Sequence, residues 1–299
     1  MKFIFQYPDF NGLEGDMLDA GPVSELAILA EAHGWDGFSF TEHPAPTAKW
    51  LSTGGHQSLD PFVALAHVAA VTSRLKLLTY LAVLPYRNPL SLAKSAATVD
   101  KLSNGRFILG VGTGYLKAEY FALGVDFEER NVLFDEALDV LPLHWAGEPF
   151  DYQGTHFSCR DTIGLPRPVQ QPIPIWIGGN ASLTIRRVAE RAQGWMPLIG
   201  PEGMFSTVRS PSMTSVDDVV DRLNMLKRLA GDRFTNLDIV LSYSDSSIYE
   251  TSVDVERHRD TLGRIAELGA TWMVLSGPRG PHPMAANFIG EFAQTYLSS

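Results

Sequence analysis

Cysteine and paired metal-ligand residues are scarce in this sequence. Cys159 is the only cysteine among its 299 residues, which excludes an intrachain disulfide and a cysteine metal cluster. The eight histidines are scattered, and the first predicted strand ends in Phe5-Gln6-Tyr7 rather than in a His-x-His pair. We therefore expect no metal site, which argues against a metal-dependent hydrolase.

Long apolar runs and clustered cations are lacking as well. No run reaches the roughly 18 apolar residues that a membrane span needs, and the apolar start is too short for a signal peptide. We therefore expect a cytoplasmic protein that does not contact a membrane. The 24 Lys and Arg residues face 34 Asp and Glu residues, for a net charge of −10 and an isoelectric point of about 5.2. This balance argues against nucleic acid as a partner, whereas one phosphorylated ligand needs only a local site.

The chain does contain a regular alternation of short apolar runs and helical patterns, and 45% of its residues are hydrophobic. The clearest helix starts are Asp60-Pro61 and Asn88-Pro89, each an N-cap residue followed by proline. The predicted strands span 2–7, 36–40, 75–84, 106–111, 173–177, 194–198, 237–242 and 271–275. Eight strands with helices between them favour the α/β class, and within it a (β/α)8 TIM barrel over an open doubly wound sheet.

The connections between these elements are uneven in length. No linker divides the chain, so we expect a single domain over 1–299. The stretch near 147–172 is rich in glycine, proline and aromatic residues, which predicts an inserted hairpin or an extended excursion. Two further stretches, 44–59 and 200–215, are predicted as long loops. Together with the excursion they are expected to shape the substrate site.

Two predicted strands end abruptly in glycines, at 106–114 and at 174–180. Glycine lets the backbone approach a ligand closely, and a helix that follows presents N–H groups suited to a phosphate. A Rossmann fingerprint is disfavoured because the first stretch follows the fourth strand and lacks the third glycine at the required spacing. Two plainer readings stay open: simple barrel packing around 110–114, and an ordinary strand-to-helix turn at 178–180 with Asn180 as the N-cap.

Polar residues at the carboxyl ends of the strands are of interest because barrel enzymes place their active sites at that face. His43 is the only histidine that follows a strand end, and it is our candidate for catalysis or cofactor contact. Its neighbour Glu42 either shares that role or only orients the loop. Glu119 is interpreted as a solvated helix residue. For Arg186 and Arg187 a solvent-facing stripe of a helix is favoured over a role as phosphate ligands. No strand ends in a lysine and no Gly-x-Ser-x-Gly elbow occurs, so a flat aromatic cofactor with a phosphate suits this face best.

Six segments of the sequence resemble the bacterial luciferase-like oxidoreductases, strongly over about 1–200 and weakly beyond. They are Gly34-Trp-Asp-Gly-Phe-Ser-Phe-Thr-Glu-His43, Arg87-Asn-Pro-Leu-Ser-Leu-Ala-Lys94, the run 97–112, Phe127-Glu-Glu-Arg-Asn131, Pro174-Ile-Trp-Ile-Gly-Gly179 and Gly194-Trp-Met-Pro197. The resemblance implies a (β/α)8 barrel that binds FMN or the deazaflavin coenzyme F420. The Arg-Asn-Pro after Leu84-Pro-Tyr86 and the Gly-Gly-Asn after the fifth strand look most like the F420-dependent branch.

The resemblance also implies site residues. His43 matches the family's histidine after the second strand, and a non-proline cis peptide under the cofactor ring would lie at Tyr80-Leu81. Gly178, Gly179 and Asn180 match the phosphate-binding positions, and Gly112, Thr113 and Gly114 would lie beside the ring or its ribityl chain. One departure concerns a glutamate that some deazaflavin dehydrogenases carry just after the fourth-strand glycines, where this chain has Tyr115.

The function implied is an oxidoreductase that uses bound F420 to transfer hydride to or from a small organic substrate. An FMN-dependent luciferase-like monooxygenase is the close alternative. A barrel that binds flavin without turnover, as a carrier or sensor, is the alternative from another class. Members of the family often form dimers, so a homodimer is a further expectation that the residues do not decide.

Overall fold

The structure is a computed structural model, and it describes residues 1–9, 12–13, 15–250 and 253–297. Within these residues eight parallel strands close into a barrel, because β3 pairs with β5 as well as with β2. The barrel strands are β1 (Lys2–Gln6), β2 (Gly37–Phe40), β3 (Lys76–Thr79), β5 (Phe107–Gly112), β8 (Ile175–Gly178), β9 (Gly194–Met196), β10 (Asp238–Ser242) and β11 (Trp272–Ser276). The predicted (β/α)8 barrel is therefore confirmed.

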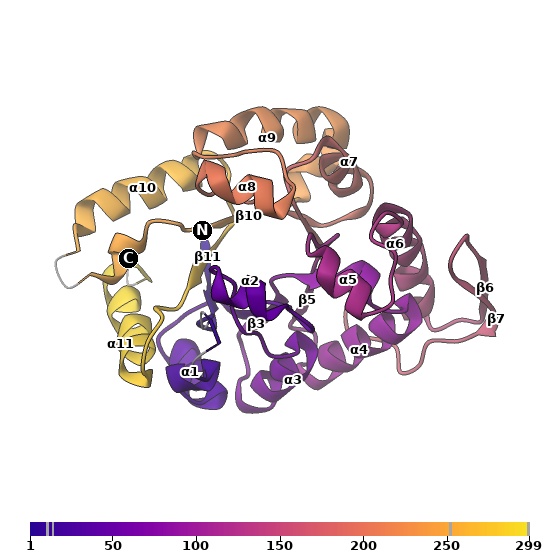
Figure 1. Cartoon of the computed structure of the whole chain (residues 1–299), viewed down its shortest axis with the longest axis horizontal. Coiled ribbons are helices and arrows are strands. Elements are labelled where there is room, and N and C mark those ends of the chain that lie inside the picture. The colour runs from indigo at the N-terminus through magenta and orange to yellow at the C-terminus, as the bar shows by residue number, and fades with distance from the viewer. Residues whose placement is uncertain (10–11, 14, 251–252, 298–299) are drawn as a thin grey trace.

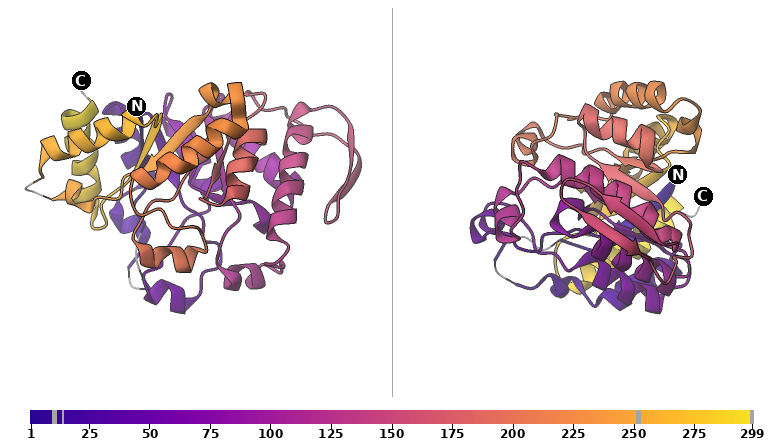
Figure 2. Two further views of the ribbon diagram at one scale, coloured as in Figure 1. Left: turned by 90° about the horizontal axis from the view of Figure 1, so that it is seen from above. Right: turned by 90° about the vertical axis from the view of Figure 1, so that its right-hand side faces the viewer.

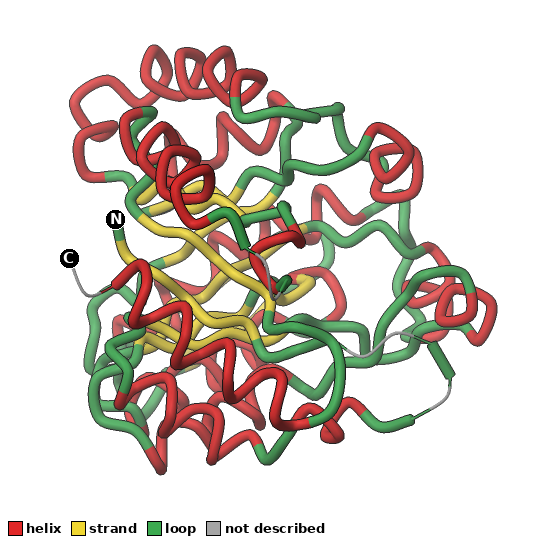
Figure 3. Tube along the Cα trace, turned by 90° about the vertical axis from the view of Figure 1, so that its left-hand side faces the viewer, coloured by secondary structure: helices red, strands yellow, loops and turns green. Residues whose placement is uncertain are grey.

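Long helices surround the barrel as an outer ring (Figures 1 and 3). They are α1 (Val23–Ala32), α3 (Pro61–Val71), α4 (Pro89–Leu102), α6 (Arg130–Ala146), α7 (Ser182–Arg191), α9 (Asp217–Ala230), α10 (Val255–Glu267) and α11 (His282–Phe292), the last continued by a π-helical turn (Ala293–Leu297). Short 3₁₀ segments lie at Met17–Ala20, Leu84–Tyr86, Gly231–Asn236 and Ser246–Tyr249. Both predicted helix starts are confirmed: Asp60 caps α3 through Phe62 N–H at 2.9 Å, and Asn88 caps α4 through Leu90 N–H at 2.9 Å.

The barrel interior is filled by one apolar side chain or two from most strands. This inner cluster consists of Ile4, Leu78, Ile108, Trp176, Met196, Val240, Trp272 and Val274. Tyr80 and Leu81 pack against it, and the peptide bond between them is cis, as the resemblance predicted. The predicted strand 75–84 is thus divided into β3 and the two-residue strand β4 (Ala82–Val83).

The predicted hairpin is present, and it projects outward beside α6 (Figures 1 and 2). It consists of β6 (Phe150–Gln153) paired antiparallel with β7 (Ser158–Thr162). The two stretches predicted as loops differ from expectation, because each contains a short helix: α2 (Ala48–Ser52) and α8 (Glu202–Val208). Thr47 caps α2, and Phe205 is the buried residue of α8. Helices this short, held by single contacts, leave little periodic signal in a sequence.

These two helices lie together with α5 (Lys117–Ala122) at one end of the barrel, as the left view of Figure 2 shows. All three follow carboxyl ends of strands, so they cover the face at which the predicted site residues lie.

The carboxylate of Glu31 joins the end of α1 to the start of β3. It accepts backbone N–H groups from Ser73, Arg74 and Leu75 at 2.7 to 3.1 Å. Burial opposes its ionisation, but the N–H groups of Arg74, Ser73 and Leu75 outweigh burial and lower the pKa of Glu31 to about 2.

We predict that Glu31→Gln lowers the free energy of unfolding at pH 7 by about 1–3 kcal/mol, the usual worth of hydrogen bonds to a charged group. A lowered carboxyl pKa gives stability that is present above the usual value of 4.5 and is lost as the pH falls through about 2. Urea titrations of both proteins should therefore converge between pH 4.5 and 2. The matched control is Glu190→Gln on α7, whose exposed side chain should leave stability unchanged at every pH.

Candidate active site

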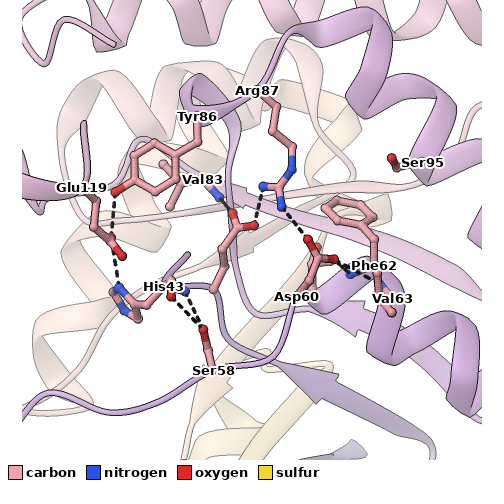
Figure 4. Close-up of polar contacts among 12 residues, drawn as sticks. His43, Ser58, Asp60, Phe62, Val63, Val83, Tyr86, Arg87, Ser95 and Glu119 are labelled. Atoms are coloured by element: carbon pink, nitrogen blue, oxygen red, sulfur yellow. Dashed lines mark hydrogen bonds and ion pairs between the residues drawn. The ribbon is translucent and has the colours of Figure 1, made fainter. Parts of the chain in front are cut away.

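His43 lies just beyond β2 and is held at three atoms (Figure 4). Its N–H donates to the Ser58 hydroxyl at 2.7 Å, and that hydroxyl donates back to the His43 carbonyl at 3.3 Å. Ring Nδ1 lies 3.2 Å from Oε2 of Glu119, and the side chain is only 10% exposed. Among the described residues, Nε2 has no hydrogen-bonding partner, so this atom is free to meet a ligand.

Glu119 is a buried partner of His43 rather than a solvated helix residue. Its side chain is 1% exposed, and its Oε2 accepts the Tyr86 hydroxyl at 2.9 Å (Figure 4). Its Oε1 accepts the Ala45 N–H at 3.3 Å. Burial, and then the Glu119 carboxylate, raise the pKa of Tyr86, so its hydroxyl stays a donor. Because the Glu119 carboxylate can only accept a hydrogen bond, the proton of the neutral His43 imidazole is placed on Nδ1, and the lone pair is left on Nε2. The solvated reading of Glu119 was wrong because α5 has only six residues, too few to reveal which face is buried.

Aromatic rings surround the imidazole of His43. The ring centroid of Trp50 lies 4.4 Å away, that of His56 4.9 Å and that of Tyr115 6.0 Å. Trp50 comes from α2, the helix that was expected to be loop. Burial, followed by Glu119 and Asp9, raises the pKa of Tyr115 to about 12, so this side chain stays neutral near pH 7. The imidazole is thus partly shielded from water by these rings.

Asp9 adds a second acidic group to this neighbourhood. Its Oδ1 accepts the Thr41 hydroxyl at 3.1 Å and lies 3.7 Å from Nδ1 of His56, and its Oδ2 accepts Gln6 Nε2 at 2.9 Å. Burial raises the pKa of Asp9, and His56 is the strongest opposing influence. The sequence analysis missed Asp9, although it lies three residues beyond the end of β1, the same kind of position that drew attention to His43.

Glu42 orients the backbone instead of facing a ligand. Its Oε2 accepts the Val83 N–H at 2.7 Å, and its Oε1 forms an ion pair with Nη1 of Arg87. Nη2 of the same guanidinium lies 3.1 Å from Oδ2 of Asp60. Burial raises the pKa of Glu42, and Arg87 opposes that rise. Of the two readings left open for Glu42, the orienting one fits. Through Val83 it fixes β4, and with it the segment that follows the cis peptide.

The glycines at the ends of β5 and β8 make room for side chains of this protein. A Cβ on Gly112 would come within 2.6 Å of Leu81, and one on Gly178 within 2.3 Å of the same side chain. Gly114, which has φ +66°, leaves space that Val83 fills. The packing reading of 110–114 therefore has direct support. Contacts of Gly112, Thr113, Gly114, Tyr80 and Leu81 with a cofactor remain predictions. Burial raises the pKa of Tyr80 to about 12, which keeps it neutral.

The turn after β8 leaves the start of α7 open. Asn180 is fully buried and bonds to Leu198 O at 2.8 Å, Leu198 N–H at 2.9 Å and Pro211 O at 2.9 Å. The N-cap of α7 is Ala181, so the reading of Asn180 as the cap was wrong. Neither a side-chain cap nor an acidic residue occupies the first turn, and a helix start of this kind suits an anion. Gly179 (φ +120°) has a conformation that favours glycine.

The two arginines of α7 differ. Arg186 is exposed, as the solvent-facing reading requires. Arg187 is 4% exposed and forms an ion pair with Asp135 at 2.7 Å, so that reading was wrong for it. Arg222 of α9 reaches the first residue of α7, with Nη1 3.3 Å from the Ser182 hydroxyl.

Among the described residues no group of three His, Cys, Asp or Glu side chains could hold a metal ion. No helix in the described ranges is long and apolar enough to cross a membrane.

Comparisons with known proteins agree with this fold. Residues 1–208 match the family described as luciferase-like monooxygenase. An uncharacterised protein of Mycobacterium tuberculosis is 30% identical over 280 residues, which cover 89% of this chain and 91% of that protein. The F420-dependent glucose-6-phosphate dehydrogenase of Microbacterium testaceum is 28% identical over 247 residues, 81% of this chain and 70% of that enzyme. The monooxygenase RslO1 of Streptomyces bottropensis shares the fold, with a TM-score of 0.80, 21% identity and 99% of each chain covered.

The contact between His43 and Glu119 predicts a tautomer that NMR can measure. In the wild type, ¹⁵N spectra of neutral His43 should show the proton on Nδ1. Glu119→Gln removes the anionic acceptor, so we expect a mixture of tautomers. Tyr86→Phe is the control, because it removes a donor to Glu119 and leaves the carboxylate beside Nδ1. A proton on Nε2 in the wild type would contradict the assignment.

Proposed function

The chain belongs to the luciferase-like monooxygenase family, and on that basis we propose that it uses bound F420 to transfer hydride to or from a small organic substrate. The observation that carries the proposal is His43, held through Nδ1 with Nε2 free at the carboxyl end of the barrel. The relative named as an F420-dependent dehydrogenase favours F420 over FMN. An FMN-dependent monooxygenase built on the same site is the alternative.

The residues around the open start of α7 are those that would hold the cofactor phosphate. Gly178 and Gly179 would contribute backbone close to the anion, and the uncapped first turn of α7 would contribute N–H groups. Asn180 would act indirectly, because its amide is already engaged with Leu198 and Pro211. The ring would lie against Tyr80, Leu81, Gly112, Thr113 and Gly114. When bound, the deazaflavin supplies the hydride acceptor or donor.

The chemistry of this chain's own residues is proton transfer and shielding. His43 Nε2, as a lone-pair carrier, accepts a proton from a substrate hydroxyl as hydride leaves the adjacent carbon, and returns it in the reverse direction. Glu119 keeps the imidazole in the matching tautomer and stabilises it once protonated. Trp50 and Tyr115 limit the access of water to the imidazole.

We also propose that residues 1–299 act as one domain. The first strand lies between the last strand and the second, with Ile4 paired to Val274 of β11 and to Gly37 of β2. Separation of the two ends of the chain would therefore open the barrel.

We predict that His43→Ala lowers kcat with a substrate by about 10²- to 10⁴-fold, the usual contribution of a general acid or base. The Kd for the cofactor should change by less than about 3-fold, because the phosphate would be held by α7 on the other side of the barrel mouth. Steady-state kinetics and fluorescence titration measure the two quantities. His67→Ala on the exposed face of α3 is the matched control and should alter neither. Turnover by the His43→Ala variant equal to that of the wild type would show that His43 takes no part in the reaction.

We predict that the chain binds F420 and FMN with different affinities. Fluorescence titration of the purified chain should give tight binding of F420 and weak binding of FMN. Tight binding of FMN alone would replace the proposal with the monooxygenase alternative. Binding without turnover of any alcohol, aldehyde or ketone substrate would favour the carrier or sensor.

A further inference from the structure

The imidazole rings of His43 and His56 are in contact just beyond β2. Their centroids lie 4.9 Å apart, and the rings are nearly perpendicular, at 81°. One loop fixes both residues, because Ser58, two positions after His56, bonds to the N–H and to the carbonyl of His43. Trp50 packs against both rings, with centroid distances of 4.4 Å to His43 and 5.5 Å to His56. The contact between the imidazoles is therefore built into the site.

The surroundings of His56 assign its tautomer. Ring Nδ1 lies 3.0 Å from the backbone carbonyl of Gln57 and 3.7 Å from Oδ1 of Asp9. Because a carbonyl oxygen only accepts hydrogen bonds, Nδ1 carries the proton of the neutral ring and Nε2 carries the lone pair. Within the described part of the chain, Nε2 of His56 has no hydrogen-bonding partner. The two imidazoles thus share one tautomer, and each has an unpaired Nε2.

Each of the two imidazoles also has a carboxylate of its own beside Nδ1. Glu119 lies 3.2 Å from His43, and Asp9 lies 3.7 Å from His56. Burial raises the pKa of Asp9, and His56 is the strongest of the influences that oppose this rise. The charged and titratable groups around the two rings are Asp9, Glu119, Tyr115 and Arg279. Either ring can therefore take up a second proton next to a carboxylate.

The path for a proton away from His43 is closed on the side of Glu119. The Glu119 side chain is 1% exposed, and its Oε2 accepts the Tyr86 hydroxyl at 2.9 Å (Figure 4). Burial, and then Glu119, raise the pKa of Tyr86, so this hydroxyl keeps its proton. The His56 side chain is 17% exposed, compared with 10% for His43. Between Glu119 and His56, it is therefore His56 that gives a proton on His43 a way to water.

We propose that His56 is the proton-relay residue of this site and passes protons between Nε2 of His43 and solvent. This inference rests on the proposed function and deepens it. When the substrate carbon is oxidised, its hydride reduces the cofactor and the hydroxyl proton goes to Nε2 of His43. The proton then moves, directly or through one water, to the lone pair on Nε2 of His56, which leaves His43 neutral and places a cation beside Asp9. Loss of this proton to water or buffer restores the starting state, and substrate reduction runs the same steps in reverse.

The relay predicts that loss of His56 affects the first turnover and later turnovers differently. His43 can hold one proton, so the first hydride transfer needs no relay, whereas each later oxidation requires that proton to leave. In dilute buffer, His56→Ala should keep the first turnover within about 3-fold of the wild type and lower the steady-state kcat by about 10²-fold, the lower end of what a positioned proton carrier contributes. Stopped-flow fluorescence of the deazaflavin, with an alcohol that the wild type oxidises, measures both rates. Added imidazole should restore the steady-state rate of the variant, because a small base replaces the missing ring.

Two further variants separate the relay from an effect on folding. His56→Gln keeps a hydrogen-bonding side chain but carries no base, so it should also give one fast turnover followed by slow ones. His67→Gln makes the same replacement on the exposed face of α3 and should change neither rate. Thermal melts establish that each variant is folded.

A measurement on the cofactor-free chain tests the pair of rings without turnover. The ¹⁵N ring signals of His43 are followed by NMR as the pH is lowered from about 9 to about 5, the range in which imidazoles gain a proton. Two imidazoles in contact titrate as a coupled pair, so the His43 signals should respond in two steps in the wild type. In His56→Gln they should respond in one step.

Steady-state turnover of both His56 variants equal to that of the wild type in dilute buffer would overturn the inference and leave the proposed function intact. Equal slowing of the first and later turnovers, with no effect of imidazole, would also overturn it, because His56 would then serve substrate binding or the fold. A one-step response of His43 in the wild type would remove the coupling on which the relay depends. If the wild type bound no deazaflavin and oxidised no alcohol, the proposed function would fall together with the relay. A single fast turnover followed by slow, imidazole-dependent turnover in His56→Ala, with the two-step response in the wild type, would establish it.

Discussion

Closure of the barrel by parallel pairing of β1 with β11 is the constraint on which the rest of this structure depends. Because all eight barrel strands run in one direction, every segment that follows a strand emerges at the same end. The short helices α2, α5 and α8 therefore meet over one face, although they lie far apart in the chain (Figure 2). His43, the cis peptide at Tyr80-Leu81 and the open start of α7 share that face for the same reason.

Buried carboxylates then fix the details of that face. Glu42 holds the backbone of β4 through Val83, and Glu119 holds the imidazole of His43. A buried carboxylate is costly unless donors surround it, so each of these acids specifies the position of its partners. Asp9 is a third such group, bonded to Thr41 and Gln6. Glu42 therefore fixes the backbone of β4, and Glu119 contacts Nδ1 of His43, which leaves Nε2 without a partner among the described residues.

The start of α7 differs in character from the surroundings of His43. The first turn of α7 lacks a side-chain cap and an acidic residue, and Nη1 of Arg222 lies 3.3 Å from the Ser182 hydroxyl at its start. A helix start of this kind favours an anion, whereas the imidazole of His43 is surrounded by the aromatic rings of Trp50 and Tyr115. This polarity is a property of the tertiary arrangement, because the chain as a whole is acidic.

The sequence by itself determined the barrel, the capped starts of α3 and α4, the hairpin and His43 at a strand end. These features depend on periodicity and on neighbouring residues, which a sequence displays directly. The cis peptide at Tyr80-Leu81 could be expected only from a family resemblance. Only the tertiary structure decided that Glu119 faces His43, from 76 positions away in the chain, and that Leu81 fills the space above Gly112. Such contacts arise when the barrel closes and brings strand ends together, and no local pattern encodes them.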